Sequence, residues 1–275
     1  MRQAIDAAAD VLAAADVGSP RVDAELLAAH AAHTDRGRLA FVTPDAAFTE
    51  RFGDLIARRA ERIPLQHLLG SAAFGPVTVE VGPGVFVPRP ETEALLEWAL
   101  TQPLAGRPVI VDLCTGSGAL ALALATRWPQ GRIVAVDDSD AALAYARRNV
   151  AGSGVDLRRA DVTAPGLLTE LDGNVDLLVA NPPYIPLGTE LEPEVAHHDP
   201  SHALFGGADG MAVIGPIVTA AARLLRPGGR CAVEHDDTTS ERTVAAFTAT
   251  GRFLAVTARH DLTGRARFVT AVRAE

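Results

Sequence analysis

The alternation of strand and helix patterns after Pro108 constrains the fold more than any other feature of this sequence. Five short apolar runs are expected to be strands: Val109–Leu113, Ile133–Asp137, Val155–Arg158, Val175–Ala180 and Cys231–Glu234. Three intervening segments are expected to be helices: Ala119–Arg127, Asp140–Val150 and Met211–Leu225. This order predicts an α/β fold with a parallel sheet and helices on both faces. Two further strands, Phe253–Ala258 and Arg267–Val272, are separated only by a loop and predict a terminal antiparallel hairpin.

The first ~65 residues have a different pattern, which predicts helices without strands. Two stripes have helical spacing, one at Ile5, Ala8 and Leu12 and the other at Val22, Leu26 and Ala29. Pro44-Asp45 can open a third helix, which Pro64 would end. The N-terminal part is therefore expected to be a helical bundle.

Between these parts, the sequence predicts a β-hairpin. Residues 73–81 alternate like a strand, Gly82-Pro83-Gly84 can turn, and Val85–Val87 can return. A helix is expected from Thr92 to Leu100. We therefore expect an N-terminal helical domain over residues 1–72, a hairpin linker over 73–87 and a catalytic domain over 88–275.

Charge and cysteine content narrow the environment and the partners of the chain. The formal net charge is −9, from 34 acidic and 25 basic residues, and every basic residue is arginine. Such a chain is a poor candidate for binding nucleic acid or an anionic membrane. Cys114 and Cys231 provide neither a disulfide framework nor metal-ligand spacing. We expect a cytoplasmic monomer without a bound metal, a membrane partner or a direct nucleic-acid partner.

A glycine-containing turn follows the first expected strand and precedes a helix. Gly116 and Gly118 allow close approach to a ligand, and Asp137 ends the next strand 21 residues after Gly116. A carboxylate there can accept hydrogen bonds from both hydroxyls of a ribose. The same spacing, with Ala121 in the last position, fits a dinucleotide-binding fingerprint, and a tight turn without ligand also fits.

Charge distinguishes the two ligands that this turn could bind. Asp112 immediately precedes the turn, where it would repel a pyrophosphate and attract an ammonium or a sulfonium. The sequence therefore favours S-adenosylmethionine over a nicotinamide dinucleotide. Cys114 lacks neighbours that would lower its pKa, so we interpret it as a small residue in a tight turn.

The tetrapeptide Asn181-Pro182-Pro183-Tyr184 follows an apolar strand, at the end where α/β sheets bind ligands. A stiff proline loop is one interpretation. The other is chemical, because an amide nitrogen is a poor nucleophile whose lone pair is delocalised. The Asn181 side-chain carbonyl and the Pro182 backbone carbonyl could orient its two N–H groups, and Tyr184 could stack on the amide plane. This predicts methyl transfer to a planar nitrogen.

With these motifs, the chain resembles the HemK/PrmC family of protein-(glutamine-N5) methyltransferases. The stretches that carry the resemblance are Ile63–Gly70 with Phe74, Val87–Glu93, Asp112–Gly118, Asp137, Asn181–Ile185, Glu194–Ala196, Ala203–Gly207 with Asp209-Gly210, Arg226–Gly229, and Asp261-Leu262 with Arg267–Val269. They span most of the chain and follow the order found in the family.

The resemblance implies a seven-stranded, Rossmann-like, S-adenosylmethionine-dependent methyltransferase domain behind an N-terminal helical bundle that docks peptide chain release factors. It implies methylation of the side-chain nitrogen N5 of the glutamine in their Gly-Gly-Gln motif. The cofactor-binding residues would be Asp112, Cys114, Thr115, Gly116, Ser117, Gly118, Asp137, Asp161, Val162 and Asn181. The substrate-binding residues would be Asn181, Pro182, Pro183 and Tyr184, of which Asn181, Pro182 and Tyr184 are the catalytic ones.

Several residues allow two interpretations. Asp161 could contact adenine or cap a strand, and Val162 departs from the aromatic residue of some members. Arg89, Glu91 and Thr92 could lie over the methionine moiety or form a helix-capping turn. His197-His198 is expected in a loop beside the substrate channel rather than in a metal site, and His235 in strand-end packing rather than as a base. These last two interpretations rest on the lack of suitably placed partner residues.

Other functions compete with release-factor methylation. A ribosomal-protein glutamine methyltransferase would recognise the same amide. An adenine-N6 methyltransferase could use the same tetrapeptide, but it would need cationic surface for phosphates. A scaffold that binds the cofactor without turnover would not need paired amide acceptors.

Overall fold

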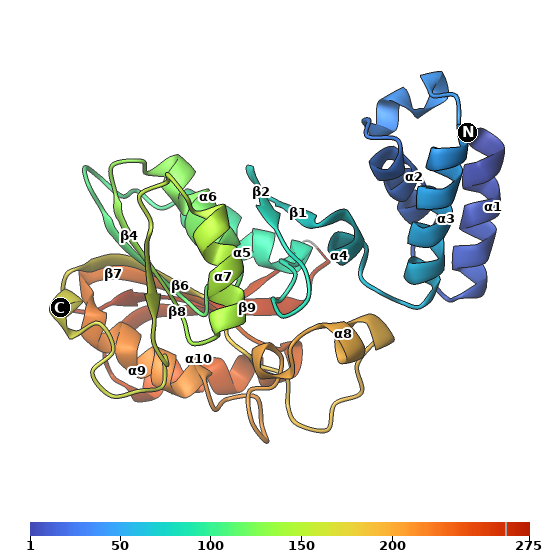
Figure 1. Ribbon diagram of the computed structural model, residues 1–275. Coiled ribbons are helices and arrows are strands. Elements are labelled where there is room, and N and C mark those ends of the chain that lie inside the picture. Colours follow the sequence, from blue (N-terminus) through green and yellow to red (C-terminus); the bar gives the residue numbers. More distant parts are fainter. Residues whose placement is uncertain (262) are drawn as a thin grey trace. The chain divides into compact units, whose positions relative to one another are not determined.

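The protein is described by a computed structural model over residues 1–261 and 263–275; Leu262, part of one motif of the resemblance, lies outside the described residues. The chain forms two compact units (Figure 1). The helical unit comprises residues 1–71, 81–83 and 191–198, and the α/β unit comprises residues 72–80, 84–190 and 199–275. Within the described residues, no helix has the length and apolar character that a membrane crossing requires.

Four α-helices and one 3₁₀ helix from the N-terminal part build the helical unit: α1 (Arg2–Ala14), α2 (Pro20–Ala31), η1 (Arg36–Phe41), α3 (Ala46–Ala60) and α4 (Leu65–Leu69). Asp45 caps α3 by accepting a hydrogen bond from the Phe48 amide at 2.6 Å. The predicted α1 stripe is confirmed, because Ile5, Ala8 and Leu12 are buried.

The predicted stripe of α2 is wrong at two of its three positions. Val22 is 40% exposed and Leu26 is only partly buried, whereas Leu27 and Ala28 are fully buried. The buried face of α2 also contains Asp23, a carboxylate that hydrophobic periodicity cannot identify as a core residue.

Asp23 is buried because it forms an ion pair with Arg59 of α3. The Arg59 guanidinium donates to Asp23 Oδ2 at 2.7 Å and to Glu194 Oε1 at 2.9 Å, and its side chain is 5% exposed. Glu194 lies in α8 (Pro193–His198) and also accepts from Arg62 at 3.0 Å. Removing one member of a buried ion pair is costly, because the remaining charge has lost its partner.

A seven-stranded sheet organises the α/β unit, in the order β5-β4-β3-β6-β7-β9-β8 (Figure 1). The strands are β3 (Val109–Leu113), β4 (Arg132–Asp137), β5 (Asp156–Arg159), β6 (Val175–Ala180), β7 (Leu225–Glu234), β8 (Phe253–His260) and β9 (Ala266–Arg273). β3 to β7 pair in parallel, and β9 is antiparallel to both β7 and β8. The predicted parallel sheet and terminal hairpin are confirmed.

Helices cover both faces of the sheet. The helices α5 (Pro90–Leu100), α6 (Ala119–Arg127) and α7 (Asp140–Asn149) pack together, and α9 (Ile214–Leu224) packs with α10 (Ser240–Ala249) on the opposite face (Figure 1). Short 3₁₀ helices lie at η2 (Thr169–Leu171), η3 (Ser201–Ala203) and η4 (Asp237–Thr239). The sequence prediction missed α10, whose fully buried side chains are limited to Thr243 and Phe247.

The hairpin exists, but its predicted turn is wrong. The two-stranded sheet pairs β1 (Ser71–Phe74) with β2 (Val77–Glu80), so the chain turns at Gly75-Pro76. Residues 85–87 belong to no strand. Asn149 of α7 ties β2 to the α/β unit, since it exchanges hydrogen bonds of 2.7 and 3.0 Å with the backbone of Glu80.

We expect Arg59→Met to lower the free energy of unfolding by about 3 kcal/mol, because Asp23 would keep a buried charge without its partner. Chemical denaturation followed by circular dichroism measures this. Arg58→Met is the matched control: Arg58 is half exposed and lies 3.9 Å from Asp54, so its loss should cost under about 1 kcal/mol. Equal effects of the two substitutions would contradict a stabilising role for the buried pair.

Candidate active site

The register of the sheet brings the ends of three strands together. Leu113 at the end of β3 pairs with Val136 of β4 on one side and with Ala180 of β6 on the other. The chain passes from β3 to β4 and later returns to β6 across β3, which makes this edge a topological switch point. The loops that follow β3, β4 and β6 therefore meet at one place.

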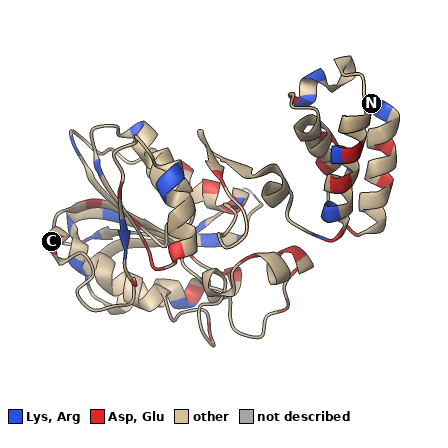
Figure 2. Ribbon diagram, in the orientation of Figure 1, with Lys and Arg blue, Asp and Glu red and all other residues tan. Residues whose placement is uncertain are grey.

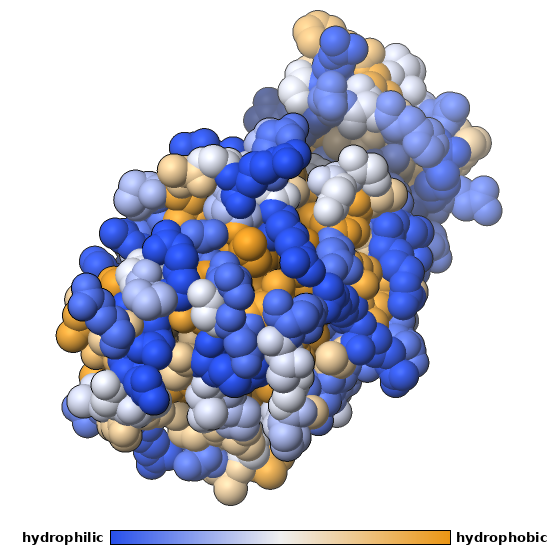
Figure 3. Space-filling view, turned by 90° about the vertical axis from the view of Figure 1, so that its left-hand side faces the viewer, coloured by the Kyte–Doolittle hydropathy of each residue, from blue (hydrophilic) through white to orange (hydrophobic). Residues whose placement is uncertain are grey.

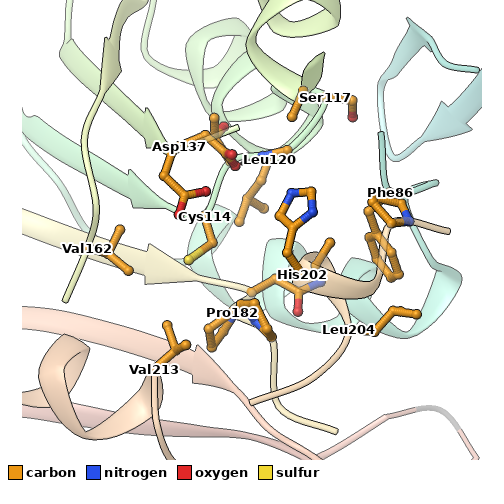
Figure 4. Close-up of a pocket in the computed structure, with 18 of the residues that line it drawn as sticks. Phe86, Cys114, Ser117, Leu120, Asp137, Val162, Pro182, His202, Leu204 and Val213 are labelled. Atoms are coloured by element: carbon orange, nitrogen blue, oxygen red, sulfur yellow. Dashed lines mark hydrogen bonds between the residues drawn. The ribbon is translucent and has the colours of Figure 1, made fainter. Parts of the chain in front are cut away.

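A pocket lies at this edge, and it gathers most of the site residues that the sequence predicted (Figure 4). Lining it are Asp112, Cys114, Thr115, Gly116, Ser117, Asp137, Asp161, Val162, Asn181, Pro182, Pro183 and Tyr184. Gly118 is not among the lining residues; it caps α6 with φ +80°, and an added Cβ there would lie 3.1 Å from Val150 Cγ1. The cofactor-binding and catalytic roles of these residues stay predictions.

Residues that were not predicted complete the pocket. In Figure 4, Val162 and Val213 lie on one side of the pocket, Phe86 and Leu204 on the other, and His202 between them. Thr92 also lines the pocket, whereas Arg89 and Glu91 do not. Arg89 instead pairs with the buried Asp199 and stacks over the Phe86 ring at 5.0 Å. Phe86, His202 and Val213 come from segments far apart in the sequence, so only the fold could identify them, whereas Val162 and Thr92 were already candidates.

Asp137 holds the glycine loop against the end of β4. Its Oδ2 accepts a hydrogen bond from the Gly116 amide at 2.8 Å, and its Oδ1 accepts one from the Ser139 amide at 3.0 Å. The Thr115 amide donates to the Val136 carbonyl at 3.0 Å. A carboxylate has about four lone-pair sites, so Asp137 can hold the loop and still accept from a ligand.

The turn itself places Cys114 in an unusual conformation. Its φ is +61°, in the left-handed region that favours glycine. Burial, followed by the charges of Asp137 and Asp112, raises the pKa of the Cys114 thiol well above its usual value. The thiol therefore stays protonated, which agrees with a residue that fills the turn.

Acidic residues predominate among the charged groups that line the pocket. Asp112, Asp137, Asp138 and Asp161 line it, and among its described lining residues there is no lysine or arginine. Burial raises the pKa of Asp112 to about 7, partly opposed by the Thr115 hydroxyl, which donates to it at 2.5 Å. Asp161 is exposed, and hydrogen bonds from the Thr163 hydroxyl and amide lower its pKa. A cationic ligand fits this field, whereas a pyrophosphate does not.

Hydrogen bonds orient Asn181 and Tyr184, which also line the pocket. Asn181 Nδ2 donates to Thr92 Oγ1 at 3.1 Å, and the Tyr184 hydroxyl donates to Glu234 Oε1 at 2.9 Å. With its NH₂ group at Thr92, Asn181 keeps its carbonyl oxygen available as an acceptor. Pro182 and Pro183 have no N–H group, so this stretch of backbone presents acceptors only.

Two glycines support this loop from behind. An added Cβ at Gly206 would lie 2.6 Å from the Pro183 carbonyl oxygen, and one at Gly210 would lie 2.4 Å from that of Tyr184. The Gly206 amide donates to the Ile185 carbonyl at 2.9 Å. The glycines of the Ala203–Gly207 and Asp209-Gly210 motifs therefore allow one backbone to lie directly against another.

Comparison with known proteins agrees with this geometry. The profile of the PrmC N-terminal domain matches residues 3–70, and that of the methyltransferase small domain matches residues 77–198. A release factor glutamine methyltransferase from Mycolicibacterium smegmatis is 69% identical over 274 residues, covering 99% of this chain and 98% of the relative. The chain belongs to this family.

A second family member, from Mycobacterium tuberculosis, is 62% identical over 278 residues and covers 99% of this chain and 91% of its own. Among solved structures, a methyltransferase from Pyrococcus furiosus has a TM-score of 0.56 at 19% identity, covering 80% of this chain and all of its own. That likeness supports the methyltransferase fold. The resemblance to the HemK/PrmC family, inferred from the motifs, is confirmed.

We expect Gly210→Ala to lower the free energy of unfolding by about 2–4 kcal/mol, because the methyl group would meet the Tyr184 carbonyl oxygen at a position with φ +79°. Gly215→Ala is the control, since a Cβ there meets no atom of the described residues within 4 Å and Gly215 lies in α9. Thermal unfolding compares the two. A harmless Gly210→Ala would show that the loop does not depend on this close packing.

Proposed function

We propose that this chain transfers a methyl group from S-adenosylmethionine to the side-chain nitrogen N5 of the glutamine in the Gly-Gly-Gln motif of peptide chain release factors. The observation that carries the proposal is the oriented Asn181 amide in a pocket lined by acidic residues. The relatives are release factor glutamine methyltransferases, which supports the same substrate.

The pocket residues suit S-adenosylmethionine in charge and in shape. The Asp112 and Asp137 carboxylates would attract its ammonium and sulfonium groups and accept from its ribose hydroxyls. Val162, Leu120 and Val213 supply an apolar surface for a flat base. When bound, this cofactor supplies an electrophilic methyl group on sulfur.

The chain's own groups would orient the nucleophile. A glutamine amide has two N–H groups, and the Asn181 side-chain carbonyl and the Pro182 backbone carbonyl are two acceptors on the same short loop. Holding both N–H groups directs the nitrogen at the methyl donor and draws its lone pair out of conjugation. Tyr184 is partly buried and lines the pocket, so its ring can offer a flat surface to the amide plane.

Charge supports a protein substrate over nucleic acid. Acidic and basic residues are interspersed over both units (Figure 2), and the net charge is −9. On the face in Figure 3, hydrophilic side chains predominate and hydrophobic ones show between them. A phosphate backbone would need a continuous cationic surface. We propose that residues 1–72 dock the release factor, residues 73–87 form the linker and residues 88–275 carry out catalysis, in a cytoplasmic monomer.

We expect methyl label from the cofactor to appear on the glutamine of a purified release factor, and Asn181→Ala to reduce turnover more than about 100-fold. Cofactor affinity should change less than about threefold. Peptide mass mapping locates the label, and calorimetry measures the affinity. A release factor with alanine in place of the glutamine is the acceptor control.

Other outcomes would overturn this proposal. Label on a ribosomal protein but not on release factor would show that the substrate is a ribosomal protein. Label on adenine would show that the acceptor is a nucleic acid and not a protein. Near-normal turnover of Asn181→Ala would remove the proposed amide orientation. Tight cofactor binding without transfer to any acceptor would support a scaffold.

We expect the affinity for S-adenosylmethionine to rise about tenfold from pH 6 to pH 8, because the raised pKa of Asp112, about 7, keeps its carboxyl mostly protonated at pH 6 and mostly ionised at pH 8. A cationic ligand binds the ionised form, so the sign is tighter binding at higher pH. Asp112→Asn should bind more weakly and with a flat profile. Calorimetry with adenosine, which is neutral, is the control; an equal pH dependence for adenosine would contradict a charge effect at Asp112.

A further inference from the structure

We infer that Glu234 is a positioning residue of the acceptor site. Its buried carboxylate orients the Tyr184 ring directly, and it orients the Asn181 side chain by way of Thr92. The inference deepens the proposed function and rests on it, because it concerns the same amide-binding loop. It assigns a role to a residue outside the tetrapeptide and outside the residues that line the pocket.

The sheet places Glu234 beside the loop that it would orient. Ala180 of β6 pairs in parallel with Val233 of β7. Asn181 and Glu234 each come one residue after the last β6–β7 pair, which is Ala180 with Val233. Both therefore lie at the same sheet edge. Glu234 is 1% exposed, and its position is set by a central strand rather than by a loop.

Tyr184 provides the direct connection. Its hydroxyl donates to Glu234 Oε1 at 2.9 Å. Burial and the charge of Glu234 raise the pKa of Tyr184 well above its usual value, so the hydroxyl keeps its proton and stays a donor. This bond fixes the ring in the plane that the proposed acceptor amide would contact.

Thr92, in the first turn of α5, provides the second connection. Its oxygen accepts from Asn181 Nδ2 at 3.1 Å. A hydroxyl has a single proton, and Asn181 Nδ2 already donates to the Thr92 oxygen, so that proton is left to point toward the neighbouring Glu234 side chain, whose pKa Thr92 lowers as a hydrogen-bonding neighbour. The chain of donors then runs one way, from the Asn181 NH₂ group through Thr92 to Glu234. Asn181 cannot reverse its amide without breaking this order.

One oxygen of the carboxylate is also left without a hydrogen-bond partner in the described residues. Within the described part of the chain, Glu234 Oε2 has no hydrogen-bond partner and Glu234 forms no ion pair. Burial raises its pKa to about 7, against the opposing effect of the two hydroxyl groups. Burying such a group costs stability. We attribute the presence of a carboxylate at this buried position to its role as hydrogen-bond acceptor for the hydroxyl groups of Thr92 and Tyr184.

Glu234→Gln tests the role, because a carboxamide keeps the size but turns one acceptor into a donor. We expect kcat for release-factor methylation to fall about 10- to 100-fold, with Kd for S-adenosylmethionine within about threefold. Thr92→Val should cause a similar fall, and Thr92→Ser, which keeps the hydroxyl, should stay within about threefold of the unsubstituted enzyme. If Glu234→Gln does not fold, the comparison of Thr92→Val with Thr92→Ser tests the inference by itself.

Combining Glu234→Gln with Thr92→Val distinguishes one chain of bonds from two independent effects. If Glu234 acts through Thr92, the double variant should be less than about threefold worse than the poorer single variant. Multiplied losses, unchanged kcat in Glu234→Gln, or a loss confined to cofactor binding would each overturn the inference.

The orientation of Asn181 can be measured without catalysis. We expect the side-chain amide ¹⁵N and ¹H resonances of Asn181 to shift in ligand-free Glu234→Gln and Thr92→Val, and to stay in place in Thr92→Ser. Failure of the unsubstituted enzyme to methylate release factor would overturn the proposed function but leave this readout intact. Unmoved Asn181 resonances in both altered variants would overturn the inference alone.

Discussion

The pairing of β3 with both β4 and β6 is the constraint on which the site depends. Because these strands are parallel and in register at Leu113, Val136 and Ala180, the three loops that follow them must begin at one sheet edge. The glycine turn, Asp137 and Asn181 are far apart in sequence, yet this pairing alone makes them neighbours. The hydrogen bonds of Asp137 then fix the turn relative to β4.

Much of this arrangement could be predicted, because strand runs and the residues that end them are local signals. Val109–Leu113 and Val175–Ala180 are observed with the predicted bounds, and so is the helix Ala119–Arg127. Hydrophobic periodicity failed where burial depends on a polar partner, as at Asp23 in α2, or where few side chains are buried, as in α10. The hairpin turn was misplaced because both glycine-proline pairs can turn.

The support of the site was not predictable in the same way. Gly206 and Gly210 are needed because the carbonyl oxygens of Pro183 and Tyr184 lie close to their Cα atoms. These two pairs of residues are separated in the sequence by α8 and a long loop. Phe86 and His202 line the pocket from two separate segments. Nothing in their local sequence carries this information, since the contacts arise from tertiary packing. A strand-end acid such as Glu234 could be noted in the sequence, but its hydroxyl partners could not.

The segment between the acceptor loop and β7 joins the two units by covalent connection. Residues 191–198 belong to the helical unit through the pairs of Glu194 with Arg59 and Arg62, whereas the chain on either side of them, up to residue 190 and from residue 199, belongs to the α/β unit. Asp199 is buried against Arg89, next to the pocket residue Pro200. Arg59 pairs both with Asp23 of α2 and with Glu194 of α8, so these two helices share one buried cation. Loss of that cation would therefore remove a partner from both Asp23 and Glu194.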